Sequence, residues 1–251
     1  MGKPRVAIFD FACCEGCQLQ IVNMEEEILD LIGAVDVVEW REGMSEQSDQ
    51  YDIAIVEGSI TRAEDEERVK EIRSRAQILI ALGSCAATGG LNKLKNNFDL
   101  DEVRRCVYGK DGSKEHLNTL MTKAVDEVVD VDYKIFGCPI ELREFVYVVR
   151  CLLMGKKPEI PEYPVCVECK SKGNVCLWES GQVCLGPVIR AGCGARCPSA
   201  GFRCFGCRGY VDSPNVDAAK EVIEKYGLDV EDLKTKMVLF GSGSTKQQVT
   251  I

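Results

Sequence analysis

A cysteine-rich loop that follows the first apolar segment constrains this chain more than any other feature. Residues 6–9 form an apolar run typical of a buried strand, and Cys13, Cys14 and Cys17 come shortly after it. A Cys-x-x-Cys pair is compatible with a redox dithiol, with half of a zinc site or with two ligands of an iron-sulfur cluster. The positions of the remaining cysteines decide among these three chemistries.

Strand-like and helical segments alternate as far as residue 157. We expect strands at 5–9, 35–40, 51–56, 78–82 and 133–136, and helices at 18–32, 63–76, 117–129 and 142–153. The polar region 91–115 is expected to form surface loops. Alternation of this kind predicts an α/β fold built on a parallel, doubly wound sheet.

Four cysteines come directly after expected strands. Cys14 and Cys17 follow the first strand, Cys85 follows the fourth and Cys138 follows the fifth. Because the carboxyl ends of parallel strands share one edge of a sheet, these thiols can converge on one ion or cluster. The alternative is that Cys85 and Cys138 are buried small apolar side chains, as free cysteines often are.

The composition changes after the proline-rich stretch 158–164. We expect an α/β domain at residues 1–158 and a small, irregular cysteine-rich domain at residues 159–251, with tail helices at 217–223 and 230–239. The second part holds eight cysteines: Cys166, Cys169, Cys176, Cys184, Cys193, Cys197, Cys204 and Cys207. Glycine and proline interrupt this segment and its hydrophobic periodicity is weak, so it is expected to fold only around metal.

Zinc is one candidate for that metal. The pairs Cys166-x-x-Cys169 and Cys204-x-x-Cys207 have a spacing typical of zinc held by four thiolates. Counted with the four strand-end cysteines, however, the chain offers twelve ligands in three sets of four. Because zinc has no redox chemistry, three such sets favour iron-sulfur clusters that relay electrons.

Charge and hydropathy exclude several classes of protein. The chain carries a formal net charge of -9, and its Lys and Arg residues are scattered among Asp and Glu, so nucleic acid is not an expected partner. No run approaches the ~18 apolar residues of a membrane-spanning helix, and the start of the chain lacks a signal-peptide pattern. We therefore expect a cytoplasmic protein with no membrane span. Because disulfides are rare in the cytoplasm, clustered cysteines there indicate metal ligation.

Taken together, these motifs resemble the small, electron-transferring subunit of [NiFe] hydrogenases. The similarity is greatest to the cytoplasmic multisubunit type that includes sulfhydrogenase and NAD(P)-linked or bifurcating enzymes, and it covers nearly the whole chain. The motifs that carry it are Cys14-x-x-Cys17, Gly83-Ser84-Cys85, Gly137-Cys138-Pro139, Cys184-Leu185-Gly186-Pro187, Gly192-Cys193, Arg196-Cys197-Pro198 and Cys204-x-Gly206-Cys207-Arg208-Gly209. Each motif alone is weak, but the combination is highly specific.

The resemblance implies a flavodoxin-like first domain and three [4Fe-4S] clusters. It implies a proximal cluster on Cys14, Cys17, Cys85 and Cys138, a distal cluster on Cys166, Cys169, Cys176 and Cys184, and a medial cluster on Cys193, Cys197, Cys204 and Cys207. Many relatives use a histidine where Cys166 stands and lack a thiol at Cys197, so we expect all-cysteine clusters here. Ile140 stands where the related motif commonly has a second proline.

Three cysteines and two carboxylates remain outside these sets. Cys151 lies among apolar residues and is expected to be packed, Cys106 is expected to be partly exposed, and Cys13 adjoins a ligand without being one. Glu15 and Glu57 follow strands at the same sheet edge. They are interpreted as ordinary solvated or interface carboxylates, with a proton route or a contact to a partner subunit as the functional alternative.

The implied function is that of a non-catalytic subunit of a hydrogenase. Electrons would pass between a Ni-Fe centre in a separate large subunit and a downstream iron-sulfur or flavin subunit that reduces NAD(P) or ferredoxin. Nucleotide binding by this chain itself is not expected, because no Gly-x-Gly-x-x-Gly follows the first strand. Two alternatives stay open: a single-cluster subunit related to respiratory complex I, and a zinc-stabilised structural adaptor.

Overall fold

Five parallel strands form the central sheet of the computed structural model, which describes residues 2–25 and 27–240. They are β1 (Arg5–Asp10), β2 (Asp36–Trp40), β3 (Ile53–Glu57), β4 (Ile78–Leu82) and β5 (Tyr133–Ile135). Their order across the sheet, β2-β1-β3-β4-β5, is that of flavodoxin-like doubly wound folds. The predicted fold class is therefore confirmed.

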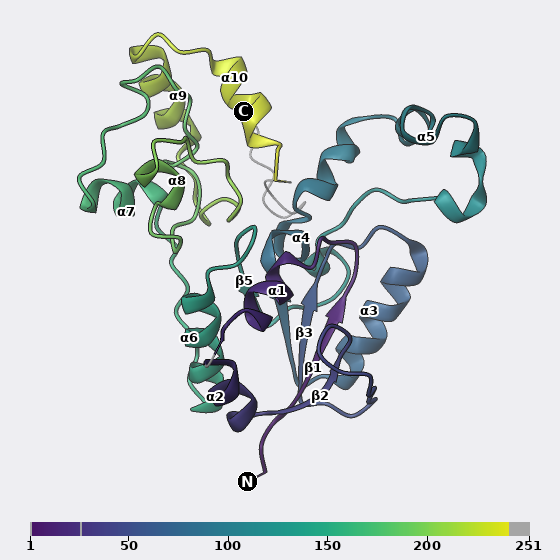
Figure 1. The fold of residues 1–251 in the computed structure, drawn as a ribbon. Coiled ribbons are helices and arrows are strands. Elements are labelled where there is room, and N and C mark those ends of the chain that lie inside the picture. The colour runs from purple at the N-terminus through teal and green to yellow at the C-terminus, as the bar shows by residue number, and fades with distance from the viewer. Residues whose placement is uncertain (1, 26, 241–251) are drawn as a thin grey trace.

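Helices cover both faces of this sheet (Figure 1). One face packs against α1 (Gly16–Val22), α2 (Glu27–Ala34) and α6 (Leu142–Leu153), and the other packs against α3 (Ala63–Arg75). Strands buried on both faces are near-continuous apolar runs, as β3 and β4 are. The single helix expected at 18–32 is wrong, because Asn23 ends α1 and Glu25 adopts a left-handed backbone with φ of 53°.

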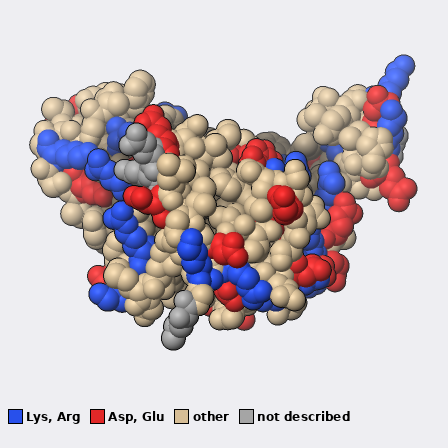
Figure 2. All heavy atoms as spheres, turned by 60° about the horizontal axis from the view of Figure 1, so that its bottom comes forward, with Lys and Arg blue, Asp and Glu red and all other residues tan. Residues whose placement is uncertain are grey.

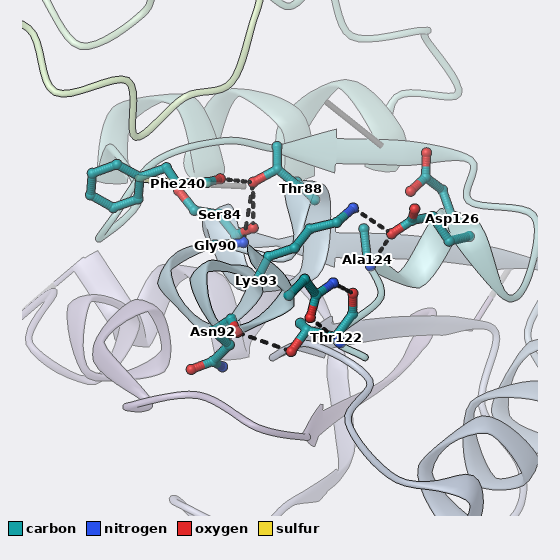
Figure 3. Close-up of polar contacts among 12 residues, drawn as sticks. Ser84, Thr88, Gly90, Asn92, Lys93, Thr122, Ala124, Asp126 and Phe240 are labelled. Carbon is teal, nitrogen blue, oxygen red and sulfur yellow. Dashed lines mark hydrogen bonds and ion pairs between the residues drawn. The ribbon is translucent and has the colours of Figure 1, made fainter. Parts of the chain in front are cut away.

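The helix expected at 117–129 is also wrong. Lys123 exchanges backbone hydrogen bonds of 2.9 Å with Ile60 in both directions, so this segment runs extended beside the residues that follow β3. A side-chain hydrogen bond also holds this segment, because the Thr122 hydroxyl donates to the Asn92 carbonyl at 3.0 Å (Figure 3). Between residues 118 and 129 only the short 3-10 turn η4 (Val125–Glu127) is helical, because tertiary hydrogen bonds have overridden the local apolar pattern.

The polar region 91–115 contains helical turns rather than the surface loops expected for it. They are η1 (Leu91–Asn97), α5 (Leu100–Tyr108) and η2 (Gly109–Ser113), followed by η3 (Glu115–Leu117). The Asp99 side chain caps α5 by accepting a hydrogen bond from the Glu102 N–H at 2.9 Å. No described residue of α5 is buried, and in Figure 1 this arm stands away from the sheet.

The cysteine-rich region has a hydrophobic core of its own, formed by buried residues between 165 and 237. Its helices are α7 (Val165–Ser171), α8 (Arg196–Ser199), α9 (Val216–Lys225) and α10 (Val230–Met237). The end of the described chain returns to the sheet, because the Thr88 hydroxyl at the end of α4 (Gly83–Thr88) lies 3.0 Å from the Phe240 carbonyl oxygen (Figure 3). The domain boundary between residues 158 and 159 stays a prediction.

Positive and negative side chains are interspersed on the face shown in Figure 2. Within residues 2–25 and 27–240, no helix is both long enough and apolar enough to cross a membrane.

Candidate functional site

The strand-end cysteines, here called the first set (Cys14, Cys17, Cys85 and Cys138), meet at the carboxyl edge of the sheet. Cys85 lies in α4, directly after β4, and Cys17 lies in the first turn of α1. Burial, together with the nearby Cys138 and Cys14 thiols, raises the pKa of the Cys85 thiol to about 12. Burial also raises the pKa of Cys17, with Glu57 and Cys85 adding to the shift. Cys85 is therefore within electrostatic reach of the other three members of the set.

Glu57 fixes the start of α1, which carries Cys17. Its carboxylate is only 2% exposed and accepts the backbone N–H groups of Cys17 and Gln18, both at 3.1 Å. These amides belong to the first turn of the helix, where no carbonyl of the same helix can accept them. The interpretation of Glu57 as a solvated carboxylate is thus wrong. Glu15 has a left-handed backbone at the same turn, and burial together with Glu42 raises its pKa.

Ile140 makes a polar contact with the thiol of Cys17. Its backbone N–H donates a hydrogen bond to the Cys17 sulfur and lowers the pKa that burial has raised. A proline at this position would have no N–H to donate. The departure of Ile140 from the related motif therefore adds a donor beside a candidate ligand.

Glycines keep the space around these sulfurs free. Gly83 has φ of +78°, and a Cβ there would overlap the Cys17 sulfur. A Cβ at Gly90, where φ is +57°, would lie 3.0 Å from the Cys85 sulfur. Both positions combine a left-handed backbone with a close approach that only glycine tolerates.

The second set comprises Cys166, Cys169, Cys176 and Cys184. Cys166 and Cys169 lie in α7. Burial raises the pKa of Cys166 to about 12, with contributions from Cys184, Cys169 and Cys176. Burial also raises the pKa of Cys184, although the backbone N–H groups of Cys204 and Gly186 lower it by donating to its sulfur. All four members are therefore electrostatic neighbours.

The third set comprises Cys193, Cys197, Cys204 and Cys207. Burial raises the pKa of Cys204, and Cys184, Cys207 and Cys193 raise it further. The pKa of Cys197 is also raised by burial and then by Cys193. Cys193 is therefore an electrostatic neighbour of both Cys197 and Cys204, while Cys204 also lies next to Cys184 of the second set. The division of the last eight cysteines into two sets of four stays a prediction.

The third set touches both of the others. The Cys204 backbone N–H donates to the Cys184 sulfur of the second set at 3.1 Å. Toward the first set, the Ser84 hydroxyl beside Cys85 donates to the Cys207 carbonyl. Burial raises the pKa of Cys207, and the Cys138 N–H opposes part of this shift by hydrogen bonding to its sulfur, so that the pKa is about 11. The third set therefore lies between the first and the second.

Comparison with known proteins gives this arrangement a family. The family model described as "NADH ubiquinone oxidoreductase, 20 Kd subunit" matches residues 14–152, more than half of the chain. The chain belongs to this family. The matched region of the chain contains all four cysteines of the first set and ends before the second set begins.

Relatives that extend into the cysteine-rich region are hydrogenase subunits. Sulfhydrogenase 2 subunit delta of Pyrococcus furiosus is 34% identical over 238 residues, covering 94% of this chain and 98% of that protein. A subunit of the F420-non-reducing hydrogenase vhu of Methanococcus voltae is 32% identical over 240 residues, covering 84% of this chain and 83% of that protein. Within the 20 Kd subunit family, this chain is thus a [NiFe] hydrogenase small-subunit-like protein.

Solved structures agree with this placement. The chain resembles a subunit of NAD+-reducing [NiFe]-hydrogenase in the H2-reduced state, with a TM-score of 0.58 and 27% identity, over 64% of this chain and 96% of that chain. It also shares its fold with the actinobacterial-type NiFe-hydrogenase from Ralstonia eutropha H16, with a TM-score of 0.55 and 16% identity, over 99% of this chain and 94% of that chain.

Three cysteines of this small-subunit-like chain lie outside the sets. Cys151 is buried in α6 and Cys106 is exposed on α5, as the sequence predicted. Cys13 is partly buried; burial raises its pKa to about 12, and Glu57 adds to the shift. Its sulfur is also near Cys85, so proximity alone does not separate it from the first set.

The donor sets have the chemistry of iron-sulfur ligation in this hydrogenase-like chain. Within the described ranges, no three His, Cys, Asp or Glu side chains come close enough to bind a single metal ion. Thiolates around one zinc ion would lie about 3.8 Å apart, given a Zn–S bond of about 2.3 Å. Four thiols in a glycine-lined space, with backbone N–H groups aimed at the sulfurs, fit an anionic multinuclear cluster.

Two residues that shape the site were not assigned these roles from the sequence. Glu57 was recognised only by its place after β3, and nothing in the sequence indicated that it is buried beneath α1. In the sequence Arg208 stands out only as part of a cysteine motif, although in the fold it is 1% exposed and bonds to three segments. Its place next to Cys207 was the one available signal.

Proposed function

We propose that this chain is the electron-relay small subunit of a [NiFe] hydrogenase and holds three all-cysteine [4Fe-4S] clusters. The first set would hold the proximal cluster, the third set the medial cluster and the second set the distal cluster. The position of the third set between the other two carries this proposal, because a linear relay needs neighbouring carriers. When bound, such clusters accept and donate single electrons.

The contribution of the protein is to hold the ligands and to set their electrostatic surroundings. The Ile140 N–H at Cys17 and the Cys204 N–H at Cys184 place positive dipole ends against ligand sulfurs. Such hydrogen bonds withdraw electron density from thiolates, and burial excludes water from them. The backbone around each set is therefore expected to tune reduction potentials without taking part in bond chemistry.

The exposed members of the first set indicate where electrons enter. Cys14 and Cys138 are exposed at the carboxyl edge of the sheet, whereas Cys17 is buried. We assign this edge to contact with a large subunit that carries the Ni-Fe centre. From the second set, electrons would continue to an iron-sulfur or flavin subunit that reduces NAD(P) or ferredoxin, and the assembly would be cytoplasmic.

The single-cluster alternative receives support only from the matched family region, which contains the first set alone. It leaves eight grouped cysteines without a role. The relatives whose match extends over the cysteine-rich region are named as hydrogenase subunits, so we favour the three-cluster relay.

Anaerobic copurification tests the proposed function. The tagged full chain, isolated under strict anaerobiosis from its native host, is expected to bring down a second protein that contains nickel. A Lys225→Glu variant on α9, distant from the first set along the chain, should retain it. Recovery of the chain with iron but with no nickel-containing partner would contradict the hydrogenase assignment and favour a different redox assembly.

A further inference from the structure

Arg208 is a fully buried cation at the junction between the two regions of the chain. It is 1% exposed and follows Cys207 of the third set directly. Its Nε donates to the Ala191 carbonyl, its Nη1 to the Phe136 carbonyl and its Nη2 to Glu144 Oε1, each at 2.7 Å. Each of the three guanidinium nitrogens therefore donates to a different segment of the chain.

These partners flank candidate ligands on both sides of the junction. Phe136 precedes Cys138 of the first set by two residues, and Ala191 precedes Cys193 of the third set by two residues. The Ser84 hydroxyl reinforces the junction by donating to the Cys207 carbonyl. Arg208 thus bonds to the backbone beside ligands of both sets.

Glu144 is the counter-ion of this cation. It projects from α6 with a side chain that is 8% exposed, and its Oε1 lies 2.7 Å from the Arg208 Nη2. Burying an isolated charge is costly, so the pair is tolerated because its charges cancel and its hydrogen bonds are made. Gly192, with φ of +113°, leaves room for the guanidinium, since a Cβ there would lie 2.9 Å from the Arg208 Cζ.

We propose that Arg208, with Glu144 as its counter-ion, is a positioning residue that fixes the spacing and balances the charge between the proximal and medial clusters. The proposal rests on the proposed function. In that relay one electron would pass between the proximal and medial clusters, so that one would be oxidised as the other is reduced. No bond forms or breaks and no proton is transferred.

Two substitutions separate the effect of charge from that of geometry. Glu144→Gln keeps the shape and an oxygen for Arg208 but leaves the buried cation unbalanced. Glu144 Oε2 accepts no hydrogen bond from the described residues, so an NH2 group there displaces no donor. Arg208→Lys keeps the charge but replaces a planar fork with a point donor that cannot reach three acceptors.

Redox titration followed by electron paramagnetic resonance, on the anaerobically purified complex, tests the charge. Because a cation stabilises the more negative reduced cluster, Glu144→Gln is expected to raise the proximal and medial potentials. We expect at least a tenfold change in each reduction equilibrium, which is about 59 mV for one electron. Asp52→Asn is the control: it makes the same charge change beside Arg5, at the opposite end of β3 from Glu57.

The geometric role is tested by Arg208→Lys in the same complex. The reduction equilibrium constant of each cluster should change by less than threefold. The magnetic interaction between the two reduced clusters should weaken, and electron transfer between them should slow at least tenfold. An unchanged interaction in Arg208→Lys together with unshifted potentials in Glu144→Gln would overturn the proposal.

Further outcomes distinguish a failure of the Arg208 proposal from a failure of the proposed function. If Arg208→Lys fails to assemble, the Glu144→Gln titration alone decides, and potentials that match those of Asp52→Asn would then overturn the charge assignment. Wild-type protein without iron and acid-labile sulfide would instead defeat the proposed function itself.

Discussion

Cys13 and Cys14 are adjacent in sequence but differ in their surroundings. Cys13 is partly buried against Glu57, which adds to the burial that raises its pKa to about 12. Cys14 is exposed and acts on both Cys85 and Cys138. Glu57 also raises the pKa of Cys17 and Cys85, so this carboxylate does not distinguish Cys13 from the ligands. The electrostatic contact of Cys14 with two members of the first set does distinguish it. These surroundings favour Cys14 as the ligand.

A pair of serine variants tests this assignment. Cys14→Ser is expected to lose the proximal cluster, which is about four irons per chain, because a serine oxygen is a poor substitute for a thiolate. Cys13→Ser is the matched control and should keep its full iron content. Iron analysis and electron paramagnetic resonance after anaerobic purification measure both variants, and equal losses would overturn the assignment.

At the scale of elements, the cysteine loop owes its geometry to the contact between β3 and α1. Glu57 at the end of β3 accepts two N–H groups of the first turn of α1, and the Trp40 ring nitrogen donates to Gln18 in the next position at 2.9 Å. The start of α1 is thereby tied to β3 and to β2. Cys17 is placed by its neighbours in the sheet rather than by its own loop.

Glu57→Gln should therefore affect both stability and metal content. The amide can accept only one of the two N–H groups and presents a donor to the other, so we expect a loss of about 2–4 kcal/mol in the free energy of unfolding. The proximal cluster should be lost or become labile. Chemical denaturation and iron analysis of the purified variant measure the two effects.

Asp65→Asn is the control for this prediction. Asp65 also accepts two backbone N–H groups at a helix start, those of Thr61 and Arg62, but it lies at α3 and away from the cysteines. The Asp65→Asn substitution should lower the free energy of unfolding by about 1 kcal/mol and leave the iron content unchanged. Iron loss of the same size in both variants would show that Glu57 has no specific role at the first set.

At the scale of the whole molecule, the sequence predicted the parallel sheet because apolar runs and the places where they end are local signals. It could not predict that 118–124 would pair with residues 60–61, since that outcome depends on tertiary hydrogen bonds. The single helix expected at 18–32 failed at Glu25, where one left-handed residue ends the periodicity.

The sequence also could not predict the contacts of Arg208 at the junction between the two regions. Arg208 reads as a surface cation by residue type, because arginine is almost never fully buried unless it is paired. Its partners Phe136 and Glu144 come from segments 72 and 64 residues away in the chain. Only the folded structure shows that this residue joins the candidate ligand sets.

Iron, acid-labile sulfide and zinc content per chain test the three-cluster relay most directly. Anaerobically purified full-length protein is expected to contain about twelve irons and a similar amount of sulfide, with no zinc and no [3Fe-4S] signal in electron paramagnetic resonance. About four irons would instead fit the single-cluster alternative. Zinc without sulfide would contradict the relay and make the chain a zinc-stabilised adaptor.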